Sequence, residues 1–194
     1  LDVGVTLCEG RRALAETAGN LMFTQTGFSS PAAMDLSHLV SARPGADLTL
    51  EVDLLRFHGD ALRGLIARKR KESIPLSVVL GAVLPEKIPS VIMSISRLPQ
   101  DARLSQIGDA DLARVMDMLT HLRAPVTGTR GFQFAQVSTG GIPVAEVDPA
   151  TMASRIVPGL HFAGEVMDVI GPCGGYNLQW AWTSGAVAGV GAAI

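Results

Sequence analysis

The sequence predicts an α+β protein in which a helical segment interrupts a β-rich one. Near the start of the chain, apolar residues alternate with small or polar ones, as in Val3, Val5 and Leu7. Between residues 53 and 125 apolar residues recur at helical spacing instead, and glycine pairs with short apolar stretches return after residue 126. The chain then ends in an apolar segment, a glycine loop and a small-residue helix, which predicts a final strand–loop–helix unit.

Residues 1–52 form the first predicted β part. Alternating apolar residues predict strands at residues 3–7, 21–24 and 48–52. Between the last two strands the sequence predicts a helix that begins with Ser30 as N-cap and Pro31 at the first helical position. This helix is expected to end near Val40, before the turn-forming Arg43-Pro44-Gly45.

Residues 53–125 form the predicted helical insert. Leucine and isoleucine recur at helical spacing at positions 54, 55, 62, 65 and 66, and shorter apolar stretches follow at 76–84 and 88–95. Asp109 is the predicted N-cap of a last helix, which carries Leu112, Val115, Met116, Leu119 and Leu122. Pro125 is expected to close the insert.

Strand character is predicted to return after Val126, and the final strand–loop–helix unit extends from Ile156 onward. Phe132, Phe134 and Val137 among polar residues indicate strand character. In the final unit, residues 160–164 are the predicted strand. On the helix that follows, Gly185, Gly189 and Ala192 are expected to leave a smooth face for packing against a sheet.

Composition excludes several classes of function. The chain has 194 residues, of which 47% are hydrophobic and 18% charged, and its formal net charge is −2. This charge gives no reason to expect nucleic acid or an anionic membrane as a partner. No apolar run reaches the roughly 18–20 residues that span a bilayer. Two cysteines form no disulfide framework, so a reducing compartment and a cytoplasmic location are expected.

Several motifs of known chemistry are absent from the sequence. The four histidines show no metal-ligand spacing, so no metal site is expected. GxSxG, GxxxxGK[ST] and GxGxxG do not occur. The basic run Arg68–Lys71 is interpreted as the solvated end of a helix, with nucleic-acid contact as a remote alternative.

The glycine loop before the last helix is the strongest candidate for a binding site. Its candidate residues are Gly171, Gly174, Gly175, Tyr176, Asn177 and Leu178. Glycines allow the backbone to approach a flat ligand closely, and N–H groups at a helix start stabilise negative charge. A tight loop that only needs positive φ angles explains the same residues equally well. The residues alone therefore indicate either a cofactor or anion loop or a structural loop.

Two further segments have the same double interpretation. Glu165, with Gly164 before it, follows the predicted strand at the sheet edge where α/β proteins bind ligands and where an acid often receives sugar hydroxyls. It could equally be an exposed acid, and Asp168 is explained by a turn. Thr139-Gly140-Gly141 suits backbone beside a substrate or ring, although a β-turn is the simpler interpretation. Arg130, in a glycine-flanked turn, suits an anion contact or a solvated bend.

The motifs of this chain resemble those of a bacterial flavoprotein family described as aminoacetone-oxidase-like or NAD(P)/FAD-dependent oxidoreductases. The specific part is the ending, which comprises Pro158–Leu160, Phe162–Glu165, Gly171-Pro172 and Gly174–Ala181. Upstream, the resemblance includes Phe23–Gly27, Ser30–Ala32, Val126–Phe132, Thr139–Gly141, Met152 and Ser154. It covers nearly the whole chain in order.

The resemblance implies a Rossmann-like FAD domain interrupted by a β-rich domain, which is itself interrupted by a helical bundle. Residues 1–52 and 126–148 would be the β-rich domain, and residues 53–125 the helical insert. Residues 149–194 would be the C-terminal end of the FAD domain. By analogy, Glu165 would face the ribityl or phosphate part of FAD, and N–H groups around Gly175–Leu178 would reach the edge of the isoalloxazine ring. In the whole enzyme, hydride would pass between a small organic substrate or NAD(P)H and the flavin. No catalytic acid or base is identified.

The family's GxGxxG loop, which holds the FAD pyrophosphate, has no counterpart in this sequence. The chain, which begins without Met, is therefore expected to be the C-terminal part of a larger enzyme, inactive and weakly FAD-binding by itself. One alternative is a non-catalytic module that needs an N-terminal partner. Another is a reductase of enone or steroid-like substrates.

Overall fold

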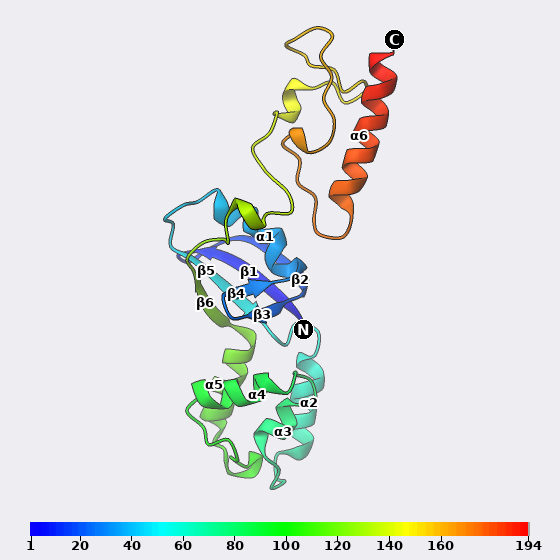
Figure 1. Ribbon diagram of the computed structural model, residues 1–194. Coiled ribbons are helices and arrows are strands. Elements are labelled where there is room, and N and C mark those ends of the chain that lie inside the picture. The colour runs from blue at the N-terminus through cyan, green and yellow to red at the C-terminus, as the bar shows by residue number, and fades with distance from the viewer. Residues whose placement is uncertain (194) are drawn as a thin grey trace. The chain divides into compact units, whose positions relative to one another are not determined.

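The computed structural model describes residues 1–193 and divides into two compact units, Leu1–Thr127 and Gly128–Ile194 (Figure 1). The described residues contain six α-helices and a four-stranded antiparallel sheet, so the predicted α+β class is confirmed. The four predicted domain segments, 1–52, 53–125, 126–148 and 149–194, stay a prediction. No helix in residues 1–193 is long and apolar enough to cross a membrane.

The first unit is built on a sheet in the order β2-β1-β5-β6. Its strands are β1 (Asp2–Glu9), β2 (Arg12–Asn20), β5 (Leu48–Asp53) and β6 (Leu122–Val126), and every pair is antiparallel. A separate hairpin joins β3 (Met22–Thr24) to β4 (Gly27–Ser29). The alternating residues Val3, Val5 and Leu7 are buried, which places one face of β1 in the core.

Helix α1 (Pro31–Ser41) packs on β1 and β2. Pro31 begins this helix as predicted, and Ser30 is the N-cap residue, although its side chain makes no capping hydrogen bond. Four further helices, α2 (Gly59–Lys69), α3 (Leu76–Leu80), α4 (Lys87–Ile95) and α5 (Asp109–Thr120), gather beyond one end of the sheet (Figure 1). A single hydrophobic cluster of buried residues extends through the sheet and these helices.

Strand β2 was not predicted from the sequence. Its only large aliphatic residue is Leu14, and its other residues are small or polar, because β2 is a half-exposed edge strand. Gly10 has a φ of +57° at the turn that returns the chain from β1 to β2. Hydrogen-bond pairing from Asp2 to Glu9 therefore fixes a strand that the hydrophobic pattern does not indicate.

The end of the helical segment differs from the prediction in three places. Leu122 and Pro125 lie in β6 and not in a helical unit, and Pro125 is tolerated because β6 is an edge strand. The N-cap of α5 is Gly108, so the assignment of Asp109 was wrong by one residue. Asp109 instead accepts a hydrogen bond from Arg70 Nη2 at 2.8 Å.

The second unit contains mostly irregular backbone and one long helix, α6 (Tyr176–Ala192). Short 3₁₀ turns occur at η2 (Phe132–Phe134), η3 (Val144–Glu146) and η4 (Gly164–Val166). The buried hydrophobic core is small and consists of Val147, Met152 and Met167.

Two predicted strands of this unit are wrong. Phe132 and Phe134 lie in a 3₁₀ turn with exposed side chains, and no described strand pairs with them. In the segment 160–164, only an isolated bridge between His161 and Ala153 forms. Apolar residues at these positions therefore do not form part of a sheet within this unit.

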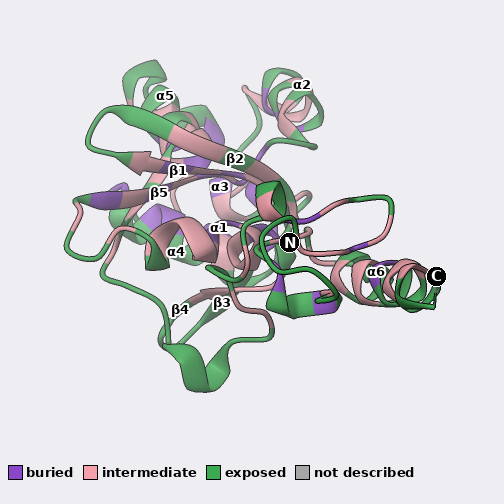
Figure 2. Ribbon diagram, turned by 90° about the horizontal axis from the view of Figure 1, so that it is seen from above, coloured by how far each residue is buried: buried purple, intermediate pink, exposed green. Residues whose placement is uncertain are grey.

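The predicted packing of the last helix against a sheet stays a prediction, because no strand of the described residues packs on that face of the helix. Gly185 and Gly189 are exposed, with no atom within 4 Å of where a Cβ would lie, and Ala192 is exposed as well. The closely packed glycine is Gly191, where a Cβ would lie 2.4 Å from the Thr151 carbonyl oxygen. Figure 2 shows that little of α6 is buried within its own unit.

Candidate functional site

The glycine loop leads into α6 through two residues with positive φ. Gly174 has a φ of +128° and Gly175 a φ of +94°, and Gly175 is the N-cap of the helix. No side chain caps this end, and the first turn contains no acidic residue. The first helical hydrogen bond runs from Gln179 N to Gly175 O at 2.9 Å, so the N–H groups of residues 176–178 lie before the helical ladder. These groups form a positively polarised end suited to an anion or a carbonyl oxygen.

Asn177 holds the loop in this shape. Its Oδ1 accepts a hydrogen bond from Gly171 N at 2.8 Å, and its Nδ2 donates to Gly171 O at 2.9 Å. A Cβ at position 171 would lie 2.8 Å from Tyr176 Cβ, so a side chain there would push the loop apart. The side-chain amide of Asn177 is therefore used within the protein, and its backbone N–H is the group left to face a ligand.

Two carboxylates connect the turn at Gly164–Glu165 to the loop at Thr139–Gly141. Glu165 Oε1 accepts a hydrogen bond from Ser138 N at 2.5 Å, and Asp168 Oδ1 accepts one from Gly140 N at 2.9 Å. A parallel bridge between Ile142 and Met167 continues this contact. Together these bonds hold the loop of Thr139 beside the turn of Glu165.

Gly141 explains how closely the two segments approach. A Cβ at this position would lie 2.3 Å from the Val166 carbonyl oxygen, so any side chain would separate them. Ile142 N donates to Val166 O at 2.8 Å, and Asp168 N donates to Ile142 O at 2.8 Å. The glycine is therefore required by packing, independently of any ligand.

Ser184 joins the Gly164 turn to α6. Its Oγ accepts a hydrogen bond from Gly164 N at 2.9 Å and donates to Trp180 O at 2.6 Å. Trp180 Nε1 in turn donates to Gly164 O at 3.2 Å. Gly164 has a φ of +70° and is buried, so the turn is held on both sides of its backbone.

The structure thus brings together two segments that the sequence singled out separately, Thr139–Gly141 and Gly164–Glu165, and joins the second of them to α6 at Trp180 and Ser184. It gives Arg130 a different role, with its guanidinium 3.7 Å from the centre of the Phe134 ring. Sequence reasoning missed Ser138, Trp180 and Ser184. The only signal for Ser184 was a hydroxyl residue within a helix of small apolar residues, which by itself does not identify a partner.

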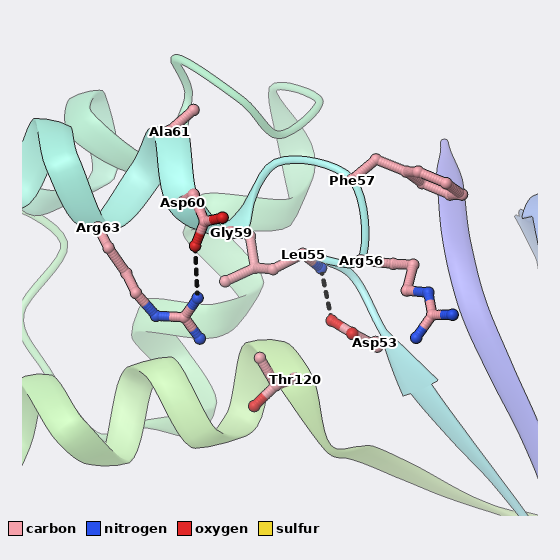
Figure 3. A pocket seen from close by; sticks show the side chains of 9 residues that line it. All are labelled: Asp53, Leu55, Arg56, Phe57, Gly59, Asp60, Ala61, Arg63 and Thr120. Atoms are coloured by element: carbon pink, nitrogen blue, oxygen red, sulfur yellow. Dashed lines mark hydrogen bonds and ion pairs between the residues drawn. The ribbon is translucent and has the colours of Figure 1, made fainter.

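Neither of two cavities in the first unit contains a predicted site residue. One, of about 320 Å³, lies between the end of β5, the start of α2 and the end of α5 (Figure 3). The other, of about 600 Å³, is lined by residues between Ser73 and Asp111. Among residues 1–193, no group of three or more His, Cys, Asp or Glu side chains could hold a metal ion. The candidate site is therefore defined by the donor geometry of the second unit and not by a cavity.

Comparison with known proteins agrees with the motifs of this site. Residues 15–191 match the model of the HI0933-like protein Rossmann domain. The chain therefore belongs to this family, which is the aminoacetone-oxidase-like family of FAD-dependent oxidoreductases. The family resemblance of the sequence is thereby confirmed.

Individual relatives give the extent of the similarity. The chain is 35% identical over 167 residues to a ribosomal RNA dihydrouridine synthase of Escherichia coli, covering 85% of this chain and 40% of that protein. It is 31% identical over 198 residues to a 3-dehydro-bile acid delta(4,6)-reductase of Clostridium scindens, covering 99% of this chain and 48% of that protein. The chain therefore spans less than half the length of these relatives.

Proposed function

We propose that this chain forms the C-terminal part of the flavin site of an FAD-dependent oxidoreductase. The observation that carries the proposal is the start of α6, which combines two positive-φ glycines, an uncapped positive helix end and a loop fixed by Asn177. Family membership supports the same assignment.

The residues present fit one side of a flavin. No atom lies within 4 Å of a Cβ built on Gly175, and a Cβ on Gly174 would meet only the Tyr176 ring, at 3.9 Å. A flat ring can therefore approach the backbone here. When bound, FAD would supply the hydride chemistry. The N–H groups of residues 176–178 would hold an electron-rich edge of the ring, and Glu165 and Asp168 would keep the loop of Thr139 in place beside the site.

The complementary part of the site is proposed to come from the region that the relatives have and this chain does not span. The sequence lacks the pyrophosphate-binding GxGxxG loop, so the chain alone should bind FAD weakly. An N-terminal partner segment, in the same polypeptide or a separate one, would complete the site, with NAD(P)H as a further proposed partner.

A charge change at Tyr176 tests the proposal. Tyr176 is 63% exposed at the first position of α6, so replacing it leaves the core intact. In the full gene product, Tyr176→Glu should weaken FAD binding about tenfold. The new carboxylate would interact with the positive end of α6 and would compete there with the electron-rich edge of the flavin. Tyr176→Gln, which has the same shape without charge, is the matched control. Equal FAD affinities of the Glu and Gln variants, by fluorescence titration, would contradict a flavin edge at this position.

A specific observation favours reduction of an unsaturated compound as the particular reaction. The relative that aligns with 99% of this chain is a delta(4,6)-reductase, and another is a dihydrouridine synthase. Anaerobic mixing of the reduced protein with an enone should then reoxidise the flavin, with little oxygen consumption in air. Rapid oxygen consumption with peroxide release would favour an oxidase instead. A protein that binds no flavin even in the full gene product would support the non-catalytic alternative.

A further inference from the structure

We infer that Arg130, held on the ring of Phe134, binds the 2′-phosphate of NADPH, so that the protein takes its hydride from NADPH and not from NADH. The inference rests on the proposed function and deepens it, since it names the hydride donor of the flavin site. The sequence alone leaves Arg130 either as an anion contact or as a solvated bend. Its surroundings in the structure favour the anion contact.

Arg130 is an isolated positive charge. It is the only charged residue between Arg123 and Glu146 in the sequence. The residue is exposed, and within residues 1–193 it takes part in no ion pair. No acid of the protein therefore neutralises this guanidinium, and its charge is available to an anion from outside the chain.

Phe134 holds this charge in one orientation. The guanidinium carbon of Arg130 lies over the Phe134 ring, 3.7 Å from its centre. Between them, Gly131 has a φ of +85°, and Phe134 N donates a hydrogen bond to Gly131 O at 3.1 Å. The negative face of an aromatic ring attracts a cation, so the stack orders the arginine before a ligand arrives. Less side-chain freedom is then lost on binding.

The stacked guanidinium keeps two surfaces for a ligand. Its N–H groups lie along the edge of the plane, where they can donate two parallel hydrogen bonds to a phosphate. Because Arg130 is exposed, the face turned away from Phe134 is open to a flat base. NADPH has a phosphate on the ribose that carries its adenine and would use both surfaces. An arginine accommodates this 2′-phosphate in dinucleotide-binding folds as well.

The segment that carries Arg130 is tied to the flavin side of the unit. Ser138 N donates to Glu165 Oε1 at 2.5 Å, and Gly140 N donates to Asp168 Oδ1 at 2.9 Å. Arg130 and Ser138 are eight positions apart, which an extended chain spans in at most about 28 Å. The adenosine of a dinucleotide is separated from its nicotinamide ring by two phosphates and a second ribose. A site for the adenosine therefore belongs on a segment that starts beside the flavin and extends away from it.

The proposed reaction needs such a donor. Reduction of an unsaturated compound consumes a hydride in each turnover, and NADPH or NADH would supply it and leave as NADP⁺ or NAD⁺. The two donors differ only in the 2′-phosphate. A residue that binds this group therefore decides between them.

The test compares two probes, adenosine 2′,5′-bisphosphate and AMP, which differ only in the 2′-phosphate. Isothermal titration uses the full gene product with excess FAD, so that the adenosine part of the flavin site is filled. The wild-type protein should bind the bisphosphate at least about tenfold more tightly than AMP, and Arg130→Gln should reduce this ratio to about threefold or less. Arg130→Lys, which keeps the charge without the planar fork, should retain part of the ratio. Arg11→Gln removes an exposed charge of the first unit and should leave the ratio unchanged.

Phe134 is tested as a positioning residue. Phe134→Ala should lower the ratio about threefold, because the guanidinium loses its support. Phe134→Tyr keeps the ring face and should restore the ratio. Phe134 is 56% exposed, so both variants should remain folded, which circular dichroism verifies.

Equal affinities of the wild-type protein for the two probes would overturn the inference, as would equal losses in Arg130→Gln and Arg11→Gln. Inorganic phosphate that binds as tightly as the bisphosphate would overturn it too, because a general anion site needs no adenosine. The proposed function fails separately, when the FAD titration shows no flavin binding. The ratio of the two probe affinities is measured whether or not flavin binds, so the two failures are distinguishable.

Discussion

The two units of this protein are held together by different means. In the first, 23 buried hydrophobic residues form one continuous core through the sheet and helices. In the second, the buried core consists of Val147, Met152 and Met167, and side-chain hydrogen bonds to backbone do much of the organising. The second unit also contains the candidate flavin site. The large hydrophobic core and the candidate site therefore lie in separate parts of the chain.

The polar organisation has a physical advantage for a binding site. Hydrogen bonds are directional, so Asn177, Ser184 and Asp168 can fix a loop in one shape without filling the space beside it. A hydrophobic core would fill that space with side chains. The following predictions, from the largest effect to the smallest, test whether the two units depend on these different forces.

The largest effect on stability is expected when a side chain in the hydrophobic core of the first unit is shortened. Leu119 is fully buried on α5, and Leu119→Ala should lower the free energy of unfolding by about 3 kcal/mol, because it removes apolar contacts and leaves a cavity. Urea denaturation followed by circular dichroism measures this. Val91→Ala, at a position 54% exposed on α4, is the control and should cost less than about 1 kcal/mol. Equal losses for both would mean that the core does not dominate the first unit.

A pair of glycines on α6 tests close packing in the second unit. Gly191→Ala should destabilise the docking of α6 by about 2 kcal/mol, because the new Cβ would overlap the Thr151 carbonyl oxygen. Gly189→Ala, two residues earlier, should stabilise the helix by up to about 1 kcal/mol, since that position is open. Hydrogen exchange of α6 measures both. Similar exchange in the two variants would refute the packing of α6 on Thr151.

Ser184 tests the polar organisation directly. Ser184→Ala leaves the buried Gly164 N–H without its acceptor and should cost about 1.5 kcal/mol. Thr183→Ala, which removes an exposed hydroxyl bonded to Gln179, is the control and should cost about 0.5 kcal/mol or less. Amide exchange at Gly164 reports on the bond. Unchanged protection in Ser184→Ala would show that the turn is held by packing instead.

The smallest effect is expected at a surface ion pair of the first unit. Arg123 and Glu51 lie on paired strands with N–O distances of 2.7 and 2.8 Å. Because the Arg123 side chain is 69% exposed, Arg123→Ala should cost less than about 1 kcal/mol, and the difference should shrink in high salt. Thermal unfolding at two salt concentrations tests this. A loss as large as that of Leu119→Ala would make electrostatics, and not the hydrophobic core, the main force in this unit.

Sequence reasoning succeeded where the local residue pattern alone indicates the secondary structure. Alternation at Val3, Val5 and Leu7 predicted β1, and Pro31 marked the start of α1. It failed where structure depends on a distant partner. Strand β2 exists because β1 pairs with it, and the predicted strand near Leu160 lacks a partner beyond one bridge at His161. Among the glycines of α6, only contact with Thr151 distinguishes Gly191 from Gly189.

The sequence by itself determined the α+β class, the flavoprotein family and the segments from which the candidate site is built, because these follow from local pattern and specific motifs. Only the tertiary structure decided that Glu165 and Asp168 bind the loop of Ser138 and Gly140, and that Ser184 holds Gly164. These contacts join residues 20 to 28 positions apart, and the strength of a hydrogen bond depends on distances and angles that residue order does not specify.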